Sequence, residues 1–465
     1  MFFSILIIII LICIITLPLI MYKSKLKKYL PLVIKIMAIA IFSLGVFRHF
    51  LNDSFLRVIN GGEFEGVYYQ THDVIQSLLR WGITLSFVVY PCAAFFNIKT
   101  FKNIAIYFCL PISIISLFFY NNFINYFIEP VGHGFYMAKW FRHLEFSLEL
   151  ILLIVIPLLL RFALDYKFDV KNKSEWKYFA IFLPLTLLVC IPVTMPQSLF
   201  GYTKFVMRLL SLPHIIWIIS IISLFIGIYF AFRNTNKEVR YSVCIFLSLF
   251  LFYHYNSMYL MGLQMRRLPL QLCNLGSYFV LISLLIKKKP FFDFVFLANV
   301  PGALIAFLAP SPDVNQGVFS YWGKHFYIEH TWVFVIPLLA VAFKLFERPD
   351  KKSIKHFFIG FSIYFAVCAI LGVIANCFLM KPGSSFFNSV NYFYLFDNTV
   401  VDILPFLKFT KNVAVTWSDY TFYPLYMVVV YILFGAFSMA IMGICKLIYK
   451  ICDKYFKSRT IEEAA

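Results

Sequence analysis

The stretch R-R-L-P-L-Q-L-C-N-L-G-S, residues 266–277, opens the part of the chain that decides the fold. Three apolar segments follow from here to His330, separated by a triple lysine at 287–289 and a polar loop. Each is close to the length of a helix that crosses a bilayer of roughly 30 Å. Each also carries polar residues that hydrocarbon disfavours, which makes them functional candidates. They are Cys273 with Asn274, Asn299 beside Pro301 and Gly302, and Glu329 with His330.

The composition of the whole chain is that of a membrane protein with many spans. Of its 465 residues, 62% are hydrophobic and only 14% are charged, which excludes a soluble domain of this length. The net charge of +19 comes from Lys and Arg in short loops between apolar segments, so it does not indicate a nucleic-acid partner. Ten cysteines are scattered without CxxC pairs or histidine-spaced clusters. We therefore expect no metal site, no disulfide framework and no cofactor.

Thirteen apolar segments are predicted to span the membrane. They are residues 2–22, 29–51, 74–96, 101–120, 141–164, 176–196, 212–232, 239–260, 270–286, 291–310, 326–346, 354–378 and 423–446. No Lys or Arg precedes the first segment, so we expect an uncleaved helix rather than a signal peptide. Every second loop, beginning with 23–28, is rich in Lys and Arg. Because basic loops stay in the cytoplasm, we predict a multi-pass cell-membrane protein with its N-terminus outside and its C-terminus in the cytoplasm.

The predicted fold is an all-α polytopic membrane helix bundle that contains two parallel repeats. Residues 101–118 resemble 291–308, and residues 138–160 resemble 323–340, in the same order. Chance similarity between Phe- and Ile-rich helices is the less favoured explanation. The repeat unit is six spans, an even number, so both halves would share one orientation. We predict an N-terminal repeat at 1–211, with no cysteine opposite Cys273, and a C-terminal domain at 212–465 that holds the site.

The polar residues of the C-terminal half gather near one membrane face. In the predicted topology Cys273 and His330 lie on different segments, each about one turn below the outer surface, and Asn299 lies mid-membrane. Pro301 and Gly302 are expected to break the helix that carries Asn299. A cysteine beside a histidine base can form a thiolate that accepts an acyl group and passes it on. The pattern therefore favours a Cys–His pair for acyl transfer.

Seven polar or charged residues are expected to support this pair. Glu329 would orient the histidine, Asn299 or Asn376 would stabilise the oxyanion, and Arg266, Arg267, Gln271 and Lys381 would bind a lipid head group. The site residues also have structural explanations. A cysteine in an apolar helix usually packs against its neighbours, and arginines near a membrane can bind lipid phosphates. The gathering of these residues at one depth favours the functional interpretation.

Four pieces of the chain carry a resemblance to a known family. They are R-L-P-L-Q-L-C-N-L at 267–275, N-V-P-G-A-L-I-A-F-L-A-P at 299–310, F-Y-I-E-H at 326–330 and A-N-C-F-L-M-K-P at 375–382. Across about residues 212–446 they resemble the YwaF-like bacterial integral membrane proteins, which in turn resemble the animal transmembrane-protein-164 acyltransferases. The resemblance implies a membrane-embedded Cys–His acyl-transfer site at Cys273 and His330 that works without coenzyme A. The chain has Gln271 where bacterial members commonly carry histidine.

Together these observations predict an acyltransferase or transacylase of the outer leaflet. A membrane phospholipid would donate the acyl chain, and a lipid or a lipoprotein would accept it. A transporter or lipid scramblase is the alternative, because parallel repeats and buried polar groups suit transporters too. The polar residues gather on one side instead of lining a path to both faces, which argues against it. A non-catalytic membrane scaffold is the third hypothesis, and the oligomeric state stays open.

Overall fold

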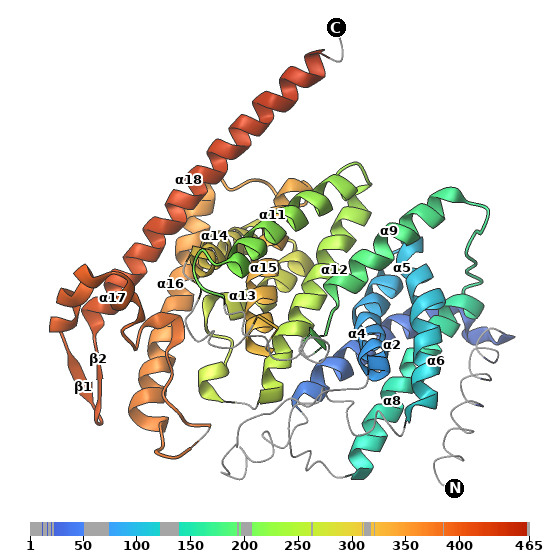
Figure 1. Ribbon diagram of the computed structural model, residues 1–465, viewed down its shortest axis with the longest axis horizontal. Helices are drawn as coiled ribbons and strands as arrows, with labels where there is room; N and C mark the ends of the chain where they lie inside the picture. The colour runs from blue at the N-terminus through green and yellow to red at the C-terminus, as the bar shows by residue number, and fades with distance from the viewer. Residues whose placement is uncertain are drawn as a thin grey trace.

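The computed structural model describes residues 23–50, 74–120, 139–192, 207–261, 264–308, 321–384 and 386–462, with residues 12, 16, 20, 195, 196, 310, 318 and 319 in isolation. Within these ranges the chain is a bundle of helices with one short β-hairpin (Figure 1). Nine of the described helices are long and apolar enough to cross a membrane. The prediction of an all-α polytopic membrane helix bundle is therefore confirmed.

The helices of the first half coincide with predicted spans. They are α2 (Leu30–Phe47), α4 (Val74–Phe95), α5 (Lys99–Ile104) continued by η3 (Ala105–Cys109) and α6 (Leu110–Phe118), α8 (Lys139–Leu158) continued by η4 (Leu159–Ala163), and α9 (Lys173–Val189). Short 3-10 turns flank α2, namely η1 (Lys25–Tyr29) before it and η2 (Arg48–Phe50) after it. The predicted first span, 2–22, lies outside the described residues apart from three isolated positions.

The helices of the second half also coincide with predicted spans. They are α11 (Leu212–Phe232), α12 (Lys237–Asn256), α13 (Leu272–Ile286), α14 (Lys289–Leu308), α15 (Tyr321–Ala342), α16 (Lys351–Ile374) continued by η7 (Ala375–Leu379), and α18 (Pro424–Glu462). Two 3-10 turns, η5 (Ser257–Met261) and η6 (Met265–Arg267), lead from α12 towards α13. Helix α18 runs well past residue 446, where the predicted span ends, and projects from the bundle (Figure 1).

The start of α16 shows how the polar loops end the apolar helices. The Asp350 carboxylate accepts hydrogen bonds from the backbone N–H groups of Lys352 and Ser353, and the Asp350 N–H donates to the Ser353 hydroxyl oxygen, which completes a capping box. The hydrogen bond from the Ser353 backbone lowers the pKa of Asp350. Because a carboxylate is the stronger acceptor, this cap is complete at neutral pH and is lost as pH falls through the lowered pKa.

The helices of the two halves pack in the same order. In the first half α2 packs against α4 and α8, while α4 packs against α5, α6 and α8. In the second half α12 packs against α13 and α15, while α13 packs against α14 and α15. The pair α5–α9 corresponds to α14–α16 in the same way. Helix α12 joins the halves because it packs against both α2 and α4. Superposition of the halves in one membrane orientation stays a prediction.

A folded segment lies between the last two spans. It contains η8 (Tyr392–Tyr394), α17 (Thr399–Ile403), η9 (Pro405–Asn412) and an antiparallel hairpin of β1 (Val415–Trp417) and β2 (Tyr420–Phe422). Lys411 joins its parts, since its Nζ donates to the Asp397 carbonyl at 2.9 Å and to the Asn398 side chain. Burial lowers the pKa of Lys411. We call residues 380–423 the outer segment, after the face on which the topology prediction places it.

The topology prediction is testable by labelling. Lys408 on η9 and Lys288 between α13 and α14 are both exposed, and they lie on opposite predicted faces. In a background without reactive cysteines, Lys408→Cys should react with an impermeant maleimide on intact cells. Lys288→Cys should react only after the cells are opened, because basic loops stay in the cytoplasm. The reverse pattern would overturn the predicted orientation.

Candidate functional site

The start of α13 is fixed by the outer segment. Gln271, the residue before the helix, uses both atoms of its amide: Nε2 donates to the Asn391 carbonyl at 2.5 Å, and Oε1 accepts from the Phe393 N–H at 3.0 Å. These bonds hold the backbone immediately before Cys273, the second residue of α13. Gln271, a predicted head-group ligand, therefore holds the outer segment against the site in this structure.

Cys273 is half-buried and faces α14. A Cβ atom at Gly302 would lie 3.9 Å from the Cys273 Sγ and 3.0 Å from the Leu272 side chain, so the missing side chain lets α14 come close to the thiol. The helix break expected at Pro301 and Gly302 is wrong, because α14 runs without interruption from Lys289 to Leu308. A break inside hydrocarbon would free more backbone hydrogen-bonding groups than the single carbonyl that Pro301 leaves unpaired.

Asn299 points into the contact between α13 and α14. It is buried, and its Oδ1 would lie 2.6 Å from a Cβ atom at Gly276, one turn after Cys273. Among the described residues, this oxygen has no hydrogen-bond partner. A buried amide oxygen without a partner is costly in an apolar interior. The unpaired oxygen can accept from a substrate, whereas a role towards an oxyanion would fall to the Nδ2 N–H of the same amide.

Asn376, the other predicted oxyanion residue, has a different place. It lies in η7, where its Nδ2 donates to the Val390 carbonyl at 2.9 Å and its Oδ1 accepts from the Val390 N–H at 2.8 Å. Both polar atoms of this amide are thus engaged with the outer segment. Of the two candidates, Asn299 is the better placed to act on a substrate.

Glu329 faces α13 and forms part of a polar chain. Its Oε1 lies 3.5 Å from the Ser277 hydroxyl, and its Oε2 lies 3.7 Å from Nδ1 of His325, one turn earlier on α15. The Nε2 of His325 lies 3.2 Å from the Tyr255 carbonyl, which can only accept. Nε2 therefore carries a hydrogen, and Nδ1 is the ring nitrogen that faces the Glu329 carboxyl group.

His330 lies beside Glu329 on α15, and its ring packs 4.1 Å from that of Phe326. Its Nδ1 lies 2.7 Å from the Phe326 carbonyl. Because a carbonyl oxygen can only accept, Nδ1 carries the hydrogen and Nε2 is left as the basic nitrogen. This is the tautomer that a general base requires.

The packing of α13 against α15 relates Cys273 to His330. The Val333 side chain, one turn after His330, lies 3.0 Å from the position of a Cβ atom at Gly276, one turn after Cys273. Both steps are three residues along a helix, so each pair shares a helix face. We infer that the face of α15 with His330 and the face of α13 with Cys273 are turned towards each other.

The basic residues predicted to bind a head group lie above the start of α13. Arg266 is exposed and donates from Nε to the Gln264 side chain at 2.7 Å, while the half-buried Arg267 accepts on its carbonyl from Tyr259 at 3.3 Å. Lys381 is exposed, with its Nζ 5.2 Å from the centre of the Phe387 ring. In the part of the chain that the structure describes, no group of three or more His, Cys, Asp or Glu side chains is arranged to hold a metal ion.

Sequence reasoning missed His325 and its surroundings. His325 stacks on His254 of α12 with ring centres 4.9 Å apart, and both rings are buried. The signal was present in the spacing, because residues four apart on a helix share one face and His325 precedes Glu329 by four. Tyr255 and Ser277 carried no such signal, since their roles come from contacts between helices.

A substitution at Gly276 tests how tightly this site is packed. Gly276→Ala would place a methyl group 2.6 Å from the Asn299 oxygen, so Asn299 must move or the helices must separate. We expect a loss of about 1–3 kcal/mol in the free energy of unfolding. Gly227→Ala is the control, because no atom lies within 4 Å of its new methyl group. Thermal unfolding in one detergent compares them, and equal stabilities would contradict the close packing.

Comparison with known proteins places the chain in a family. The model of the TMEM164 family matches residues 209–443, a range that contains every predicted site residue. Neither the curated proteins nor the solved structures give a match. Since the matched range covers just over half of the 465 residues, this chain belongs to the TMEM164 family.

Proposed function

We propose that this protein is a membrane-embedded acyltransferase that carries an acyl chain on Cys273. The donor is a membrane phospholipid, and the acceptor is a lipid or a lipoprotein in the outer leaflet. The observation that carries the proposal is the half-buried Cys273 thiol in the first turn of α13, against Gly302 of α14 and one turn before Gly276, which the Asn299 and Val333 side chains approach. The resemblance described from the sequence, to acyltransferases of this family, supports the same chemistry.

Cys273 differs from the other described cysteines in its place on a helix. The structure describes eight cysteines. Six of them are buried, and only Cys273 and Cys445 are half-buried. Cys273 is the second residue of α13, at the end of the helix that Gln271 joins to the outer segment. Cys445 lies in the middle of α18, away from both ends. Cys273 is thus the cysteine best suited to nucleophilic attack, and Cys445 is its matched control.

The proposed reaction uses groups of this chain alone. His330 Nε2 takes the proton of the Cys273 thiol, and the sulfur attacks the ester carbonyl carbon of the phospholipid. The Asn299 Nδ2 N–H donates to the oxyanion that forms. The carbon–oxygen bond then breaks, the leaving lysophospholipid takes the proton from the imidazolium, and the acyl chain remains on Cys273 as a thioester. An acceptor hydroxyl or amine reverses these steps and restores the thiol.

The remaining polar residues support this cycle. Arg266, Arg267 and Lys381 offer positive charge to the phosphate of the donor at the outer end of the site. Glu329, predicted to orient His330, lies against Ser277 and His325. We assign the His325–Glu329 pair a second role: it holds a proton beside the site, and its contact with Ser277 fixes α15 against α13.

A transporter or lipid scramblase is the second candidate. The observation that favours it is a buried charged pair in the first half, Arg48 with Glu149 at 3.6 Å. Arg48 also donates to the Tyr253 hydroxyl of α12 at 2.8 Å, so the charge lies where the halves meet. Buried charges at the contact between parallel repeats are typical of transporters. A scramblase would not need the Cys273 thiol, which separates the two candidates.

The thiol is the first test. Cys273→Ala should lower acyl transfer from a labelled phospholipid at least about 100-fold, because no nucleophile remains. Cys445→Ala removes the matched thiol from α18 and should leave transfer unchanged. Wild-type protein incubated with donor should gain an acyl mass on Cys273 that neutral hydroxylamine removes. Full activity of Cys273→Ala would sink the acyltransferase proposal and favour the scramblase.

The histidines are the second test. His330→Ala should lower the turnover about 100-fold, because a general base typically contributes that much or more. In the double variant with Cys273→Ala, the additional loss should be small, since the two side chains act as one unit. His325→Ala should reduce turnover less than His330→Ala. A larger effect at His325 would transfer the role of base to that residue.

A further inference from the structure

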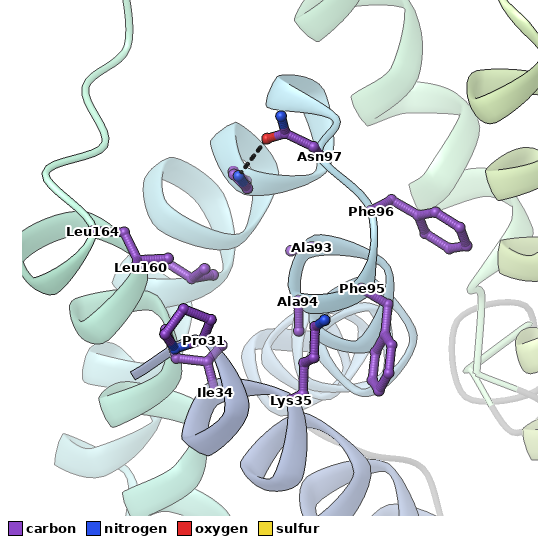
Figure 2. A pocket seen from close by; sticks show the side chains of 11 residues that line it. Pro31, Ile34, Lys35, Ala93, Ala94, Phe95, Phe96, Asn97, Leu160 and Leu164 are labelled. Carbon is purple, nitrogen blue, oxygen red and sulfur yellow. Dashed lines mark hydrogen bonds between the residues drawn. The ribbon is translucent and has the colours of Figure 1, made fainter. Parts of the chain in front are cut away.

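A cavity of about 240 Å³ lies in the first half, between α2, α4, the start of α5 and the end of η4 (Figure 2). Its polar lining is Lys35, Lys102 and Asn97, and its apolar lining includes Phe95, Leu160 and Leu164. It lies at the first turns of α2 and the last turn of α4. The lysine distribution predicts this end of the helices as cytoplasmic, so the cavity and Cys273 lie on opposite faces.

The two lysines of this cavity are not paired with the nearby carboxylate of Glu238, which accepts from the Asn97 N–H at 3.2 Å. Lys102 Nζ donates to the Asn97 side chain at 3.0 Å, and Lys35 Nζ lies 5.5 Å from the centre of the Phe95 ring. Lys35 extends between Ala94 and Phe95 (Figure 2). Among the described residues, no Asp or Glu lies within ion-pair distance of either lysine. Both side chains are half-buried, and such ammonium groups are stabilised by a bound anion.

Two other lysines on the same predicted face are paired. Lys99 lies 2.5 Å from Glu175, and Lys289 of the second half lies 3.0 Å from Asp293. The similarity of 101–118 to 291–308 puts Asn103 where the second half has Asp293. The amide of Asn103 accepts from a tyrosine hydroxyl and brings no charge. In this register Lys99 corresponds to Lys289, and each has its own carboxylate. Lys102 corresponds to Phe292, so it is an additional cation of the first half.

The surface around the cavity is apolar. On α2 the exposed side chains are Leu32 and Ile36, and at the end of η4 they are Phe162 and Leu164. Such residues face the acyl chains of a bilayer when the helix spans it. A ligand with an anionic head and apolar chains therefore matches both parts of the site: its head fits the lysines, and its chains fit the flanks.

We propose that this cavity binds the phosphate head group of an anionic phospholipid in the cytoplasmic leaflet. Basic pockets between membrane helices on this side suit such head groups. The 3-10 turn η1 adds Lys25, Lys27 and Lys28 to the same end of α2, which raises the local positive potential. The site does not depend on the acyl-transfer proposal, because it uses other helices and the other membrane face.

Lipid binding to the purified full chain in neutral detergent tests the proposal. Native mass spectrometry would compare phosphatidylglycerol with phosphatidylcholine of the same chains. We expect phosphatidylglycerol to bind about tenfold more tightly, because each lysine contributes to the attraction of an anionic lipid. Lys35→Gln with Lys102→Gln should reduce its affinity to that of phosphatidylcholine. The matched control, Lys288→Gln with Lys355→Gln, removes two exposed charges elsewhere on this face and should change the affinity less than about twofold.

A second variant leaves both lysines in place. Ala94→Phe fills the cavity with a ring and should abolish the preference for phosphatidylglycerol, so a double variant that fails to fold does not end the test. Inorganic phosphate should not compete at the concentration at which the lipid binds. Equal binding of the two lipids, equal loss in the control, or full competition by inorganic phosphate would each overturn the proposal.

Discussion

The close approach of α13 to α14 is the constraint on which the candidate site depends. Gly276 receives the Asn299 side chain, and Gly302 receives Leu272 and the Cys273 thiol. Both contacts belong to one antiparallel register, because a step of three along one helix matches a step of three along the other. A side chain at either glycine would force Asn299, Leu272 or the helices themselves to shift. Close packing is a main attraction between helices in lipid, so this register sets the depth of the thiol.

A second constraint comes from helix α16 and the outer segment, whose contacting residues lie 94 to 127 residues later in the sequence. The Leu270 carbonyl accepts from the Tyr364 hydroxyl at 2.8 Å and from the Cys368 thiol at 3.4 Å. The Met265 carbonyl accepts from the Tyr392 hydroxyl at 2.7 Å. These bonds occupy backbone groups that precede the first turn of α13 and would otherwise lie unpaired at the membrane surface. Helix α16 and the outer segment thus preorganise the approach to Cys273.

The parts of the fold that the sequence predicts are those set by local composition. Runs of apolar residues and the alternation of basic loops mark the helices, because each segment that crosses lipid must itself be apolar and form its own backbone hydrogen bonds. The length of α18 was not predictable this way, since a helix that leaves the membrane no longer needs apolar residues.

The site was predictable in its residue types but less so in its contacts. Cys273, Asn299 and Glu329 stand out because each is polar in an apolar run. The contacts of the site residues do not follow from the sequence. Asn376 and Gln271, for example, bind backbone groups of the outer segment whose positions depend on the tertiary fold. His325 was within reach of sequence reasoning through its spacing from Glu329.

The buried Arg48 has a consequence for how the protein is made. Its guanidinium needs Glu149 of α8 and the Tyr253 hydroxyl of α12, so its partners are synthesised about 100 and about 200 residues after it. A charged side chain near the end of a membrane helix is costly while it faces lipid. The contacts around Arg48 are therefore complete only after α12 has entered the membrane. During biogenesis, completion of the first half is coupled to synthesis of the second.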